Sequence, residues 1–231
     1  LRCKVGRMSV TGALGYEIHC RMGDHITLRK TLLAAGAEVG IKEIGFNAMM
    51  SLRLEKSYGV WSAEFTQGYT PAMTAMDRWI DFDKAGFVGR DAAISERDGD
   101  GPKQIQVTLD VAAEGADASG YEPIWHDGRK VGFVTSGGYG HTLDKSYAMG
   151  LVDVGSAIEG TELTVHIVGV ERTAKVIAPS PYDPMGKAMK YTHDASTVDA
   201  GSRTNPAAEQ HCANCALVQG ADGDEWRPCQ I

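Results

Sequence analysis

The chain has 231 residues, of which 43% are hydrophobic and 23% charged, and its formal net charge is −7. This composition is typical of a globular protein, and the acidic balance argues against a nucleic-acid or anionic-membrane surface, since both need a basic patch. No run of about 18 apolar residues occurs, so the sequence predicts no membrane-spanning helix. The length allows one large or two ordinary domains.

The chain starts at Leu1, without an initiating Met or a signal peptide, and stops at Ile231. We therefore interpret the sequence as part of a longer polypeptide. For that reason the absence of a signal peptide indicates little about export.

The first hundred residues predict a mixed α/β region. Residues 16–19 alternate as an extended strand after the turn residues that precede them. Helices are expected at about 24–35 and 45–56, the first with an acidic N-cap and a glycine stop. The second has apolar side chains on nearly all sides, so we expect it to be buried. Residues 86–97 predict a turn followed by a short amphipathic helix.

Beyond residues 98–102, a polar Asp/Gly/Pro stretch, the hydrophobic period changes to two. Residues 104–111 predict a half-buried strand, and Asp127-Gly128 supplies the positive φ angles of a tight hairpin turn. Further strands are expected at 131–135, 148–152, 163–167 and 174–177. So many short strands with turn residues between them predict a small antiparallel barrel or sandwich. The predicted fold class is therefore α+β, a mixed α/β subdomain followed by a small antiparallel β-barrel and an irregular cysteine-bearing tail.

The five cysteines are unevenly distributed. Cys3 and Cys20 lie singly in core-like segments, where free thiols are common. Cys212, Cys215 and Cys229 all fall near the end of the chain. An odd number with such clustering favours metal ligation over a disulfide framework.

Glu17 places a carboxylate within the strand predicted at 16–19. On an extended strand its side chain points to the face opposite Tyr16 and Ile18. A carboxylate in that position must be solvated, paired or bound to a polar group. The residues alone leave two interpretations open: an edge-strand acid that faces water, or an acid that binds a ligand.

Several separated motifs over residues 1–186 carry a resemblance to a known family. They are SVTGALGYEI at 9–18, SLRLEK at 51–56, GFVTSGG at 132–138 and AMG at 148–150. The chain resembles the folate-binding aminomethyltransferase family, which includes the glycine-cleavage T-protein and the C-terminal half of dimethylglycine and sarcosine dehydrogenases. Trp61 and the runs at 70–78 and 181–186 favour the dehydrogenase group.

This resemblance implies a tetrahydrofolate site in which Glu17 binds the pterin, because a carboxylate accepts two parallel hydrogen bonds from an amino-pyrimidine edge. Val10 stands where the family often has Tyr, and Met49 where T-proteins commonly have Arg. Arg53, one helical turn beyond Met49, is expected to pair with a nearby acid. The acid that assists methylene transfer belongs to the family's first half, so we assign no catalytic residue here and expect these residues alone to be inactive.

The tail resembles a second family, the high-potential iron–sulfur proteins. Its spacing is Cys-x2-Cys-x13-Cys, and residues 190–195 are similar to the opening segment of that family. A 4Fe-4S cluster needs four thiolates; Cys212, Cys215 and Cys229 supply three, and a fourth is expected about a dozen residues further on. The resemblance also implies that Tyr191 packs beside the cluster and that the domain transfers one electron.

Two other interpretations of the tail stay open. A zinc ion bound by the three cysteines and His211 is one, since Cys3His is a common zinc ligand set. His211 directly adjoins Cys212, however, which makes ligation by both awkward. The other is a set of unligated thiols. The expected domains are thus the α/β part of an aminomethyltransferase-like domain at 1–100, its C-terminal barrel at 101–186, and a truncated high-potential iron–sulfur domain at 187–231.

Together the resemblances imply part of a flavin-dependent dehydrogenase that demethylates an N-methyl amine such as dimethylglycine or sarcosine. FAD would bind in an N-terminal part outside these residues, tetrahydrofolate would trap the one-carbon unit before it escapes as formaldehyde, and the 4Fe-4S domain would carry the electrons. The alternatives are a non-catalytic folate-binding and electron-transfer module, and a plain folate aminomethyltransferase.

The partners implied by this hypothesis are the folate, the amine and an electron-transfer partner, with no nucleic acid and no membrane span. Folate chemistry favours a cytoplasmic location. High-potential iron–sulfur proteins are typically periplasmic, so the periplasm is the alternative.

Overall fold

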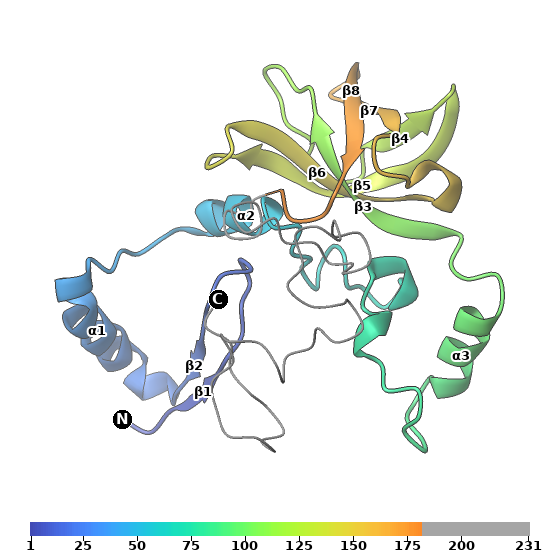
Figure 1. The fold of residues 1–231 in the computed structure, drawn as a ribbon. Helices are drawn as coiled ribbons and strands as arrows, with labels where there is room; N and C mark the ends of the chain where they lie inside the picture. The colour runs from blue at the N-terminus through green and yellow to red at the C-terminus, as the bar shows by residue number, and fades with distance from the viewer. Residues whose placement is uncertain (182–231) are drawn as a thin grey trace, which may run out of the picture. The chain divides into compact units, whose positions relative to one another are not determined.

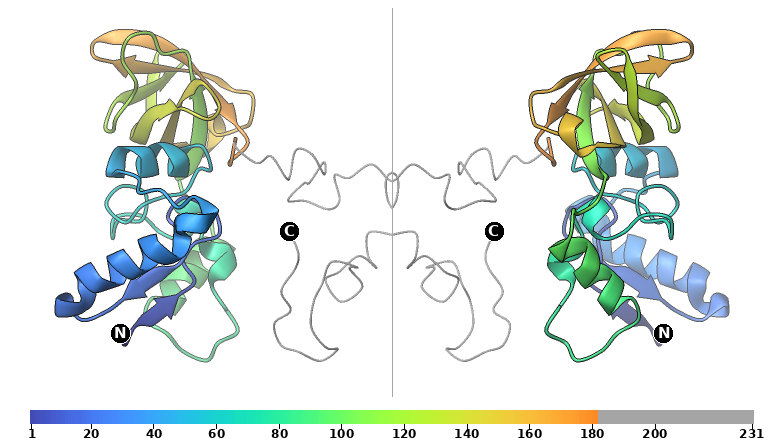
Figure 2. Two further views of the ribbon diagram at one scale, coloured as in Figure 1. Left: turned by 90° about the vertical axis from the view of Figure 1, so that its left-hand side faces the viewer. Right: turned by 90° about the vertical axis from the view of Figure 1, so that its right-hand side faces the viewer.

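The computed structural model describes residues 1–181 (Figures 1 and 2). The mixed region comes first and contains two short strands and three α-helices among the described residues: β1 (Lys4–Gly6), β2 (Glu17–His19), α1 (His25–Gly36), α2 (Phe46–Leu54) and α3 (Arg90–Asp98). The strands that follow are β3 (Gln104–Val111), β4 (Pro123–His126), β5 (Arg129–Gly140), β6 (Lys145–Asp153), β7 (Glu162–Ile167) and β8 (Val170–Ile177). Short 3₁₀ turns lie at Met22–Asp24, Ala37–Val39, Ala72–Thr74, Asp77–Trp79 and Val154–Ser156.

Strands β3 to β8 form a closed barrel in the order β3-β6-β5-β4-β7-β8, with β3 pairing antiparallel to both β6 and β8. Closure removes the sheet edges and encloses an aliphatic core. Leu109, Ile124, Val134, Val152 and Val165 are all fully buried in it. The α+β fold class and the barrel are confirmed, and the sandwich alternative is wrong.

The hairpin between β4 and β5 turns at Asp127 and Gly128, whose φ angles are 49° and 74°. Two successive positive φ angles are the signature of a type I′ turn, as the sequence predicts. Strand β5 is longer than predicted, because it continues to Gly140 past an irregularity between Val134 and Ser136. Gly137 lies in this extension because a side chain there would come within 2.4 Å of the carbonyl oxygen of Ala118.

Helix α2 contradicts the expectation of a buried helix. Phe46 is 69% exposed, and only Arg53 and Leu54 of the helix are buried. The physical reason is that the C-terminal end of the helix lies against the barrel, where Ser51 Oγ donates to the carbonyl of Tyr139 at 2.7 Å (Figure 1). Among the described residues no segment covers the first turn, so its apolar side chains face outward.

Helix α1 begins one residue after Asp24, close to the predicted start. Asp24 occupies the N-cap position, although its side chain makes no capping hydrogen bond. Within the part of the chain that the structure describes, no helix combines the length and apolarity needed to cross a bilayer.

Candidate functional site

Glu17 begins strand β2 and lies opposite Gly6 of β1 in an antiparallel pair. Its side chain is 41% exposed, and one carboxylate oxygen lies 3.4 Å from Nε2 of His19. The two side chains share a face because they are two residues apart on a strand. Glu17 is therefore accessible to a ligand from solvent and already has one polar neighbour.

The turn before β2 lies against the segment that follows α2. Gly12 has φ of 75°, and a Cβ there would lie 2.7 Å from Cδ of Lys56 and 2.9 Å from a ring carbon of Tyr58. Lys56 Nζ also donates to the carbonyl of Gly12 at 3.4 Å. Glycine is needed for both the backbone angle and this close approach. The segment leading to Glu17 is thus positioned by the residues that follow α2.

The end of α2 is in turn fixed to the barrel by a buried acid. Arg53 Nη1 lies 3.3 Å from Oε2 of Glu64, and both side chains are almost fully buried. The other carboxylate oxygen of Glu64 accepts hydrogen bonds from Thr135 at 2.7 Å and Ser136 at 2.5 Å, both on β5. The backbone N–H of Val60 donates to Oε2 at 2.9 Å. The expectation that Arg53 pairs with a nearby acid is confirmed.

Burial lowers the pKa of Arg53 from its ordinary value, and the charge of Glu64 opposes that shift. The same guanidinium donates to the carbonyl of Tyr58 at 3.0 Å. A second buried acid, Glu55, accepts from the backbone N–H of Thr142 at 2.6 Å and of Leu143 at 3.2 Å. Because buried polar groups need such partners, these contacts hold the end of α2 against the barrel.

Neither Glu55 nor Glu64 was singled out from the sequence. Glu64 lies in a largely apolar run at 60–65, which predicts a paired buried charge but does not identify its partner. Glu55 lies between Arg53 and Lys56 and carries no such signal. The other two positions singled out by the resemblance contribute no charge: Val10 is 38% exposed and Met49 is half-buried.

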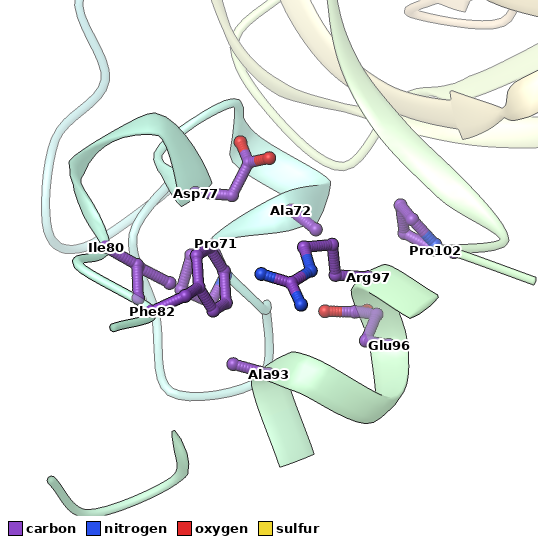
Figure 3. Close-up of a pocket in the computed structure, with 10 residues that line it drawn as sticks. Pro71, Ala72, Asp77, Ile80, Phe82, Ala93, Glu96, Arg97 and Pro102 are labelled. Carbon is purple, nitrogen blue, oxygen red and sulfur yellow. The ribbon is translucent and has the colours of Figure 1, made fainter. Parts of the chain in front are cut away.

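A cavity of about 240 Å³ lies between α3 and the segment at 71–82 (Figure 3). Arg97 extends over the ring of Phe82, with its guanidinium carbon 4.4 Å from the ring centroid. Its Nε donates to Asp98 at 2.7 Å, and Glu96 accepts from Thr70 at 2.9 Å. These charged groups already have partners, and Glu17 is not among the lining residues.

The predicted metal ligands Cys212, Cys215 and Cys229 lie outside the described residues, as do His211 and Tyr191. Among residues 1–181, no group of three or more His, Cys, Asp or Glu side chains is arranged to hold a metal ion. The roles of Glu17 and the three cysteines therefore stay predictions.

Comparison with protein families matches three successive parts of the chain. Residues 1–84 match the GCVT N-terminal domain, 103–183 the glycine cleavage T-protein C-terminal barrel domain, and 178–231 the high potential iron-sulfur protein family. The second match coincides with the closed barrel.

Individual relatives fall into two groups. Mouse and human mitochondrial dimethylglycine dehydrogenases are each 34% identical over 172 residues, which is 74% of this chain and 20% of theirs. An aminomethyltransferase of Halalkalibacterium halodurans is 30% identical over 178 residues, 77% of this chain and 48% of the relative.

A solved structure has the same fold over the described region. The glycine cleavage system aminomethyltransferase T of Bartonella henselae has a TM-score of 0.69 and 28% identity, covering 76% of this chain and 48% of its own. The chain thus spans about half the length of the aminomethyltransferases and a fifth of the dehydrogenases. It belongs to the aminomethyltransferase and dimethylglycine dehydrogenase-like proteins through its GCVT N-terminal and barrel domains, which a high potential iron-sulfur protein region follows.

Proposed function

We propose that this chain is the folate-binding, one-carbon-transfer region of a flavin-dependent dehydrogenase that demethylates an N-methyl amine such as dimethylglycine or sarcosine. The observation that carries the proposal is that similarity to dimethylglycine dehydrogenases and to an iron–sulfur protein occurs on one chain. Amine oxidation releases electrons that a fused carrier can accept, whereas folate-dependent transfer alone releases none.

In this proposal Glu17 holds the pterin of tetrahydrofolate. Its half-exposed carboxylate offers the planar pair of acceptors that an amino-pyrimidine edge requires. The hydrogen bond from Lys56 to the carbonyl of Gly12 supports the role, because it holds the segment that leads to Glu17. His19, at 3.4 Å, leaves further lone pairs of the carboxylate available to the ligand.

Cys212, Cys215 and Cys229 are proposed to supply three thiolates to a 4Fe-4S cluster. The ligand type fits such a cluster, and the number is one short of the four required. A bound cluster supplies one-electron transfer, which suits the stepwise reoxidation of a flavin. The FAD itself would be held by residues outside this sequence, and folate chemistry favours a cytoplasmic location over the periplasm.

A non-catalytic folate-binding and electron-transfer module is the second candidate. Two observations favour it: Val10 offers no hydrogen-bond donor to a folate, and Met49 offers no charge for its carboxylates. Both candidate functions include pterin binding by Glu17 and a 4Fe-4S cluster in the tail. They differ in whether the one-carbon unit is transferred to tetrahydrofolate on this chain.

The distribution of products tests the transfer. The flavoprotein that contains this sequence is given dimethylglycine under single-turnover conditions, with and without tetrahydrofolate, and formaldehyde and methylene-tetrahydrofolate are quantified. The proposal predicts that tetrahydrofolate suppresses formaldehyde release and that Glu17→Gln restores it. Glu171→Gln is the matched control, because Glu171 also lies 3.4 Å from a histidine on a strand. Equal formaldehyde release with and without tetrahydrofolate would contradict the transfer role.

The cluster has its own test. A chain extended through the next cysteine is reconstituted anaerobically with iron and sulfide, oxidised, and examined by electron paramagnetic resonance. The proposal predicts a paramagnetic oxidised state, as a high-potential cluster gives. A colourless protein that binds zinc in a 1:1 ratio would instead support the Cys3His site.

A further inference from the structure

The two cysteines of the mixed region flank the same strand pair. Strands β1 and β2 pair Lys4 with His19, Val5 with Ile18 and Gly6 with Glu17. One step outward along this register, Cys3 comes opposite Cys20. Both are free and half-buried in the structure. No sequence pattern associates these two cysteines, which sixteen residues separate.

Their separation suits a covalent bond. Residues directly opposite each other in an antiparallel pair have Cα atoms about 4.5 or 5.5 Å apart. A disulfide spans Cα separations of about 4.4 to 6.8 Å, so it fits either kind of pair without a large backbone movement. Burial raises the pKa of the Cys20 thiol, and the nearby thiol of Cys3 raises that pKa further. The two thiols therefore interact electrostatically.

We propose that Cys3 and Cys20 form a redox-active pair, which a disulfide oxidant such as glutathione disulfide converts into a cross-strand disulfide that closes the β1–β2 ribbon. The protein thiols lose two protons and two electrons and form one S–S bond. Glutathione disulfide takes up both and leaves as two glutathione thiols.

A disulfide would stabilise the β1–β2 ribbon, because the ribbon is short. Only three residue pairs hold β1 to β2, and Val5 in the middle of β1 is 61% exposed. An isolated two-stranded ribbon is marginally stable in water. Glu17 begins β2 and Cys20 directly follows that strand, so oxidation holds the Glu17 carboxylate in register with Gly6. The link to folate rests on the proposed function; the disulfide itself does not.

Peptide mapping of the full 231-residue chain tests the bond. The protein is equilibrated anaerobically in a series of glutathione redox buffers, alkylated and digested, and the cysteine-containing peptides are identified by mass spectrometry. The expected product is a Cys3–Cys20 linked peptide that a dithiol reductant removes. In Cys20→Ser, Cys3 should accumulate instead as a mixed disulfide with glutathione. Linkage of either cysteine to the tail cysteines, or single glutathionylation of both at equilibrium, would overturn the proposal.

Hydrogen exchange tests the effect on the ribbon. The amides of residues 4–6 and 17–19 should exchange about tenfold more slowly in the oxidised than in the reduced wild type. They should not respond to the oxidant in Cys3→Ser, and the barrel amides of the same samples report whether each variant is folded. A linked peptide without slower exchange would refute the closing of the ribbon, and it would leave the separate question of folate binding by Glu17 unaffected.

Discussion

Neutralising Glu64 is expected to destabilise the junction between α2 and the barrel. In Glu64→Gln the amide retains the shape of the side chain and an acceptor for Thr135 and Ser136, but the charge opposite Arg53 is lost. Arg53 is 1% exposed, so its guanidinium stays buried without a counter-ion. Removing one partner of a buried ion pair costs about 3–5 kcal/mol. We therefore expect a decrease of that size in the free energy of unfolding.

Urea denaturation followed by circular dichroism measures this decrease, provided that the slope with urea concentration is unchanged. The double variant Arg53→Met/Glu64→Gln should lose less stability than the sum of the two single variants, because it leaves no unpaired charge. Asp98→Asn, in the exposed Arg97–Asp98 pair, is the control and should lower the denaturation midpoint far less than Glu64→Gln does. A Glu64→Gln midpoint equal to that of the wild type would show that Glu64 does not compensate the buried charge of Arg53.

Two further predictions concern the barrel and the pH dependence. Gly132→Ala would place a Cβ 1.9 Å from the carbonyl oxygen of Leu151. This substitution should therefore destabilise the barrel by at least about 2 kcal/mol, as measured by thermal unfolding. Gly155→Ala is the control and should have no effect, because its Cβ would meet nothing within 4 Å. The Arg29 guanidinium lowers the pKa of Glu43 below its usual value of 4.5, so this pair stabilises the fold above that pH and the contribution is lost as the pH falls through the lower, folded-state pKa. Glu43→Gln should therefore flatten the acid side of the stability curve in urea titrations at successive pH values, and an unchanged curve would contradict this assignment.

The barrel was predictable because its signals are local. Alternating apolar residues mark the strands, and Asp127-Gly128 marks the type I′ turn through backbone angles that few residues adopt. The length of β5 was not predictable by the same reasoning. Gly137 and Gly138 are typical of a turn, whereas in the barrel Gly137 permits a close approach of Ala118. Only the tertiary structure distinguishes these two uses of glycine.

The surroundings of the candidate site depend on distant contacts, which local patterns do not contain. The composition of α2 is that of a buried helix, yet Phe46 is 69% exposed, because burial depends on what lies across from the helix. Glu64 meets Ser136, which is 72 residues away. The strand position of Glu17 followed from alternation, and its proposed role from resemblance. Its pairing with His19 needed the structure.

Binding of the tetrahydrofolate pterin by Glu17 can be measured by titrating the full chain with tetrahydrofolate. Tetrahydrofolate should quench the tryptophan fluorescence of the wild type saturably. Glu17→Gln should bind about 10- to 100-fold more weakly, since hydrogen bonds to a charged acceptor contribute about 1.5–3 kcal/mol. Glu171→Gln, the matched histidine-paired control, should bind like the wild type. If a folded Glu17→Gln variant binds tetrahydrofolate as tightly as the wild type, Glu17 does not bind the pterin.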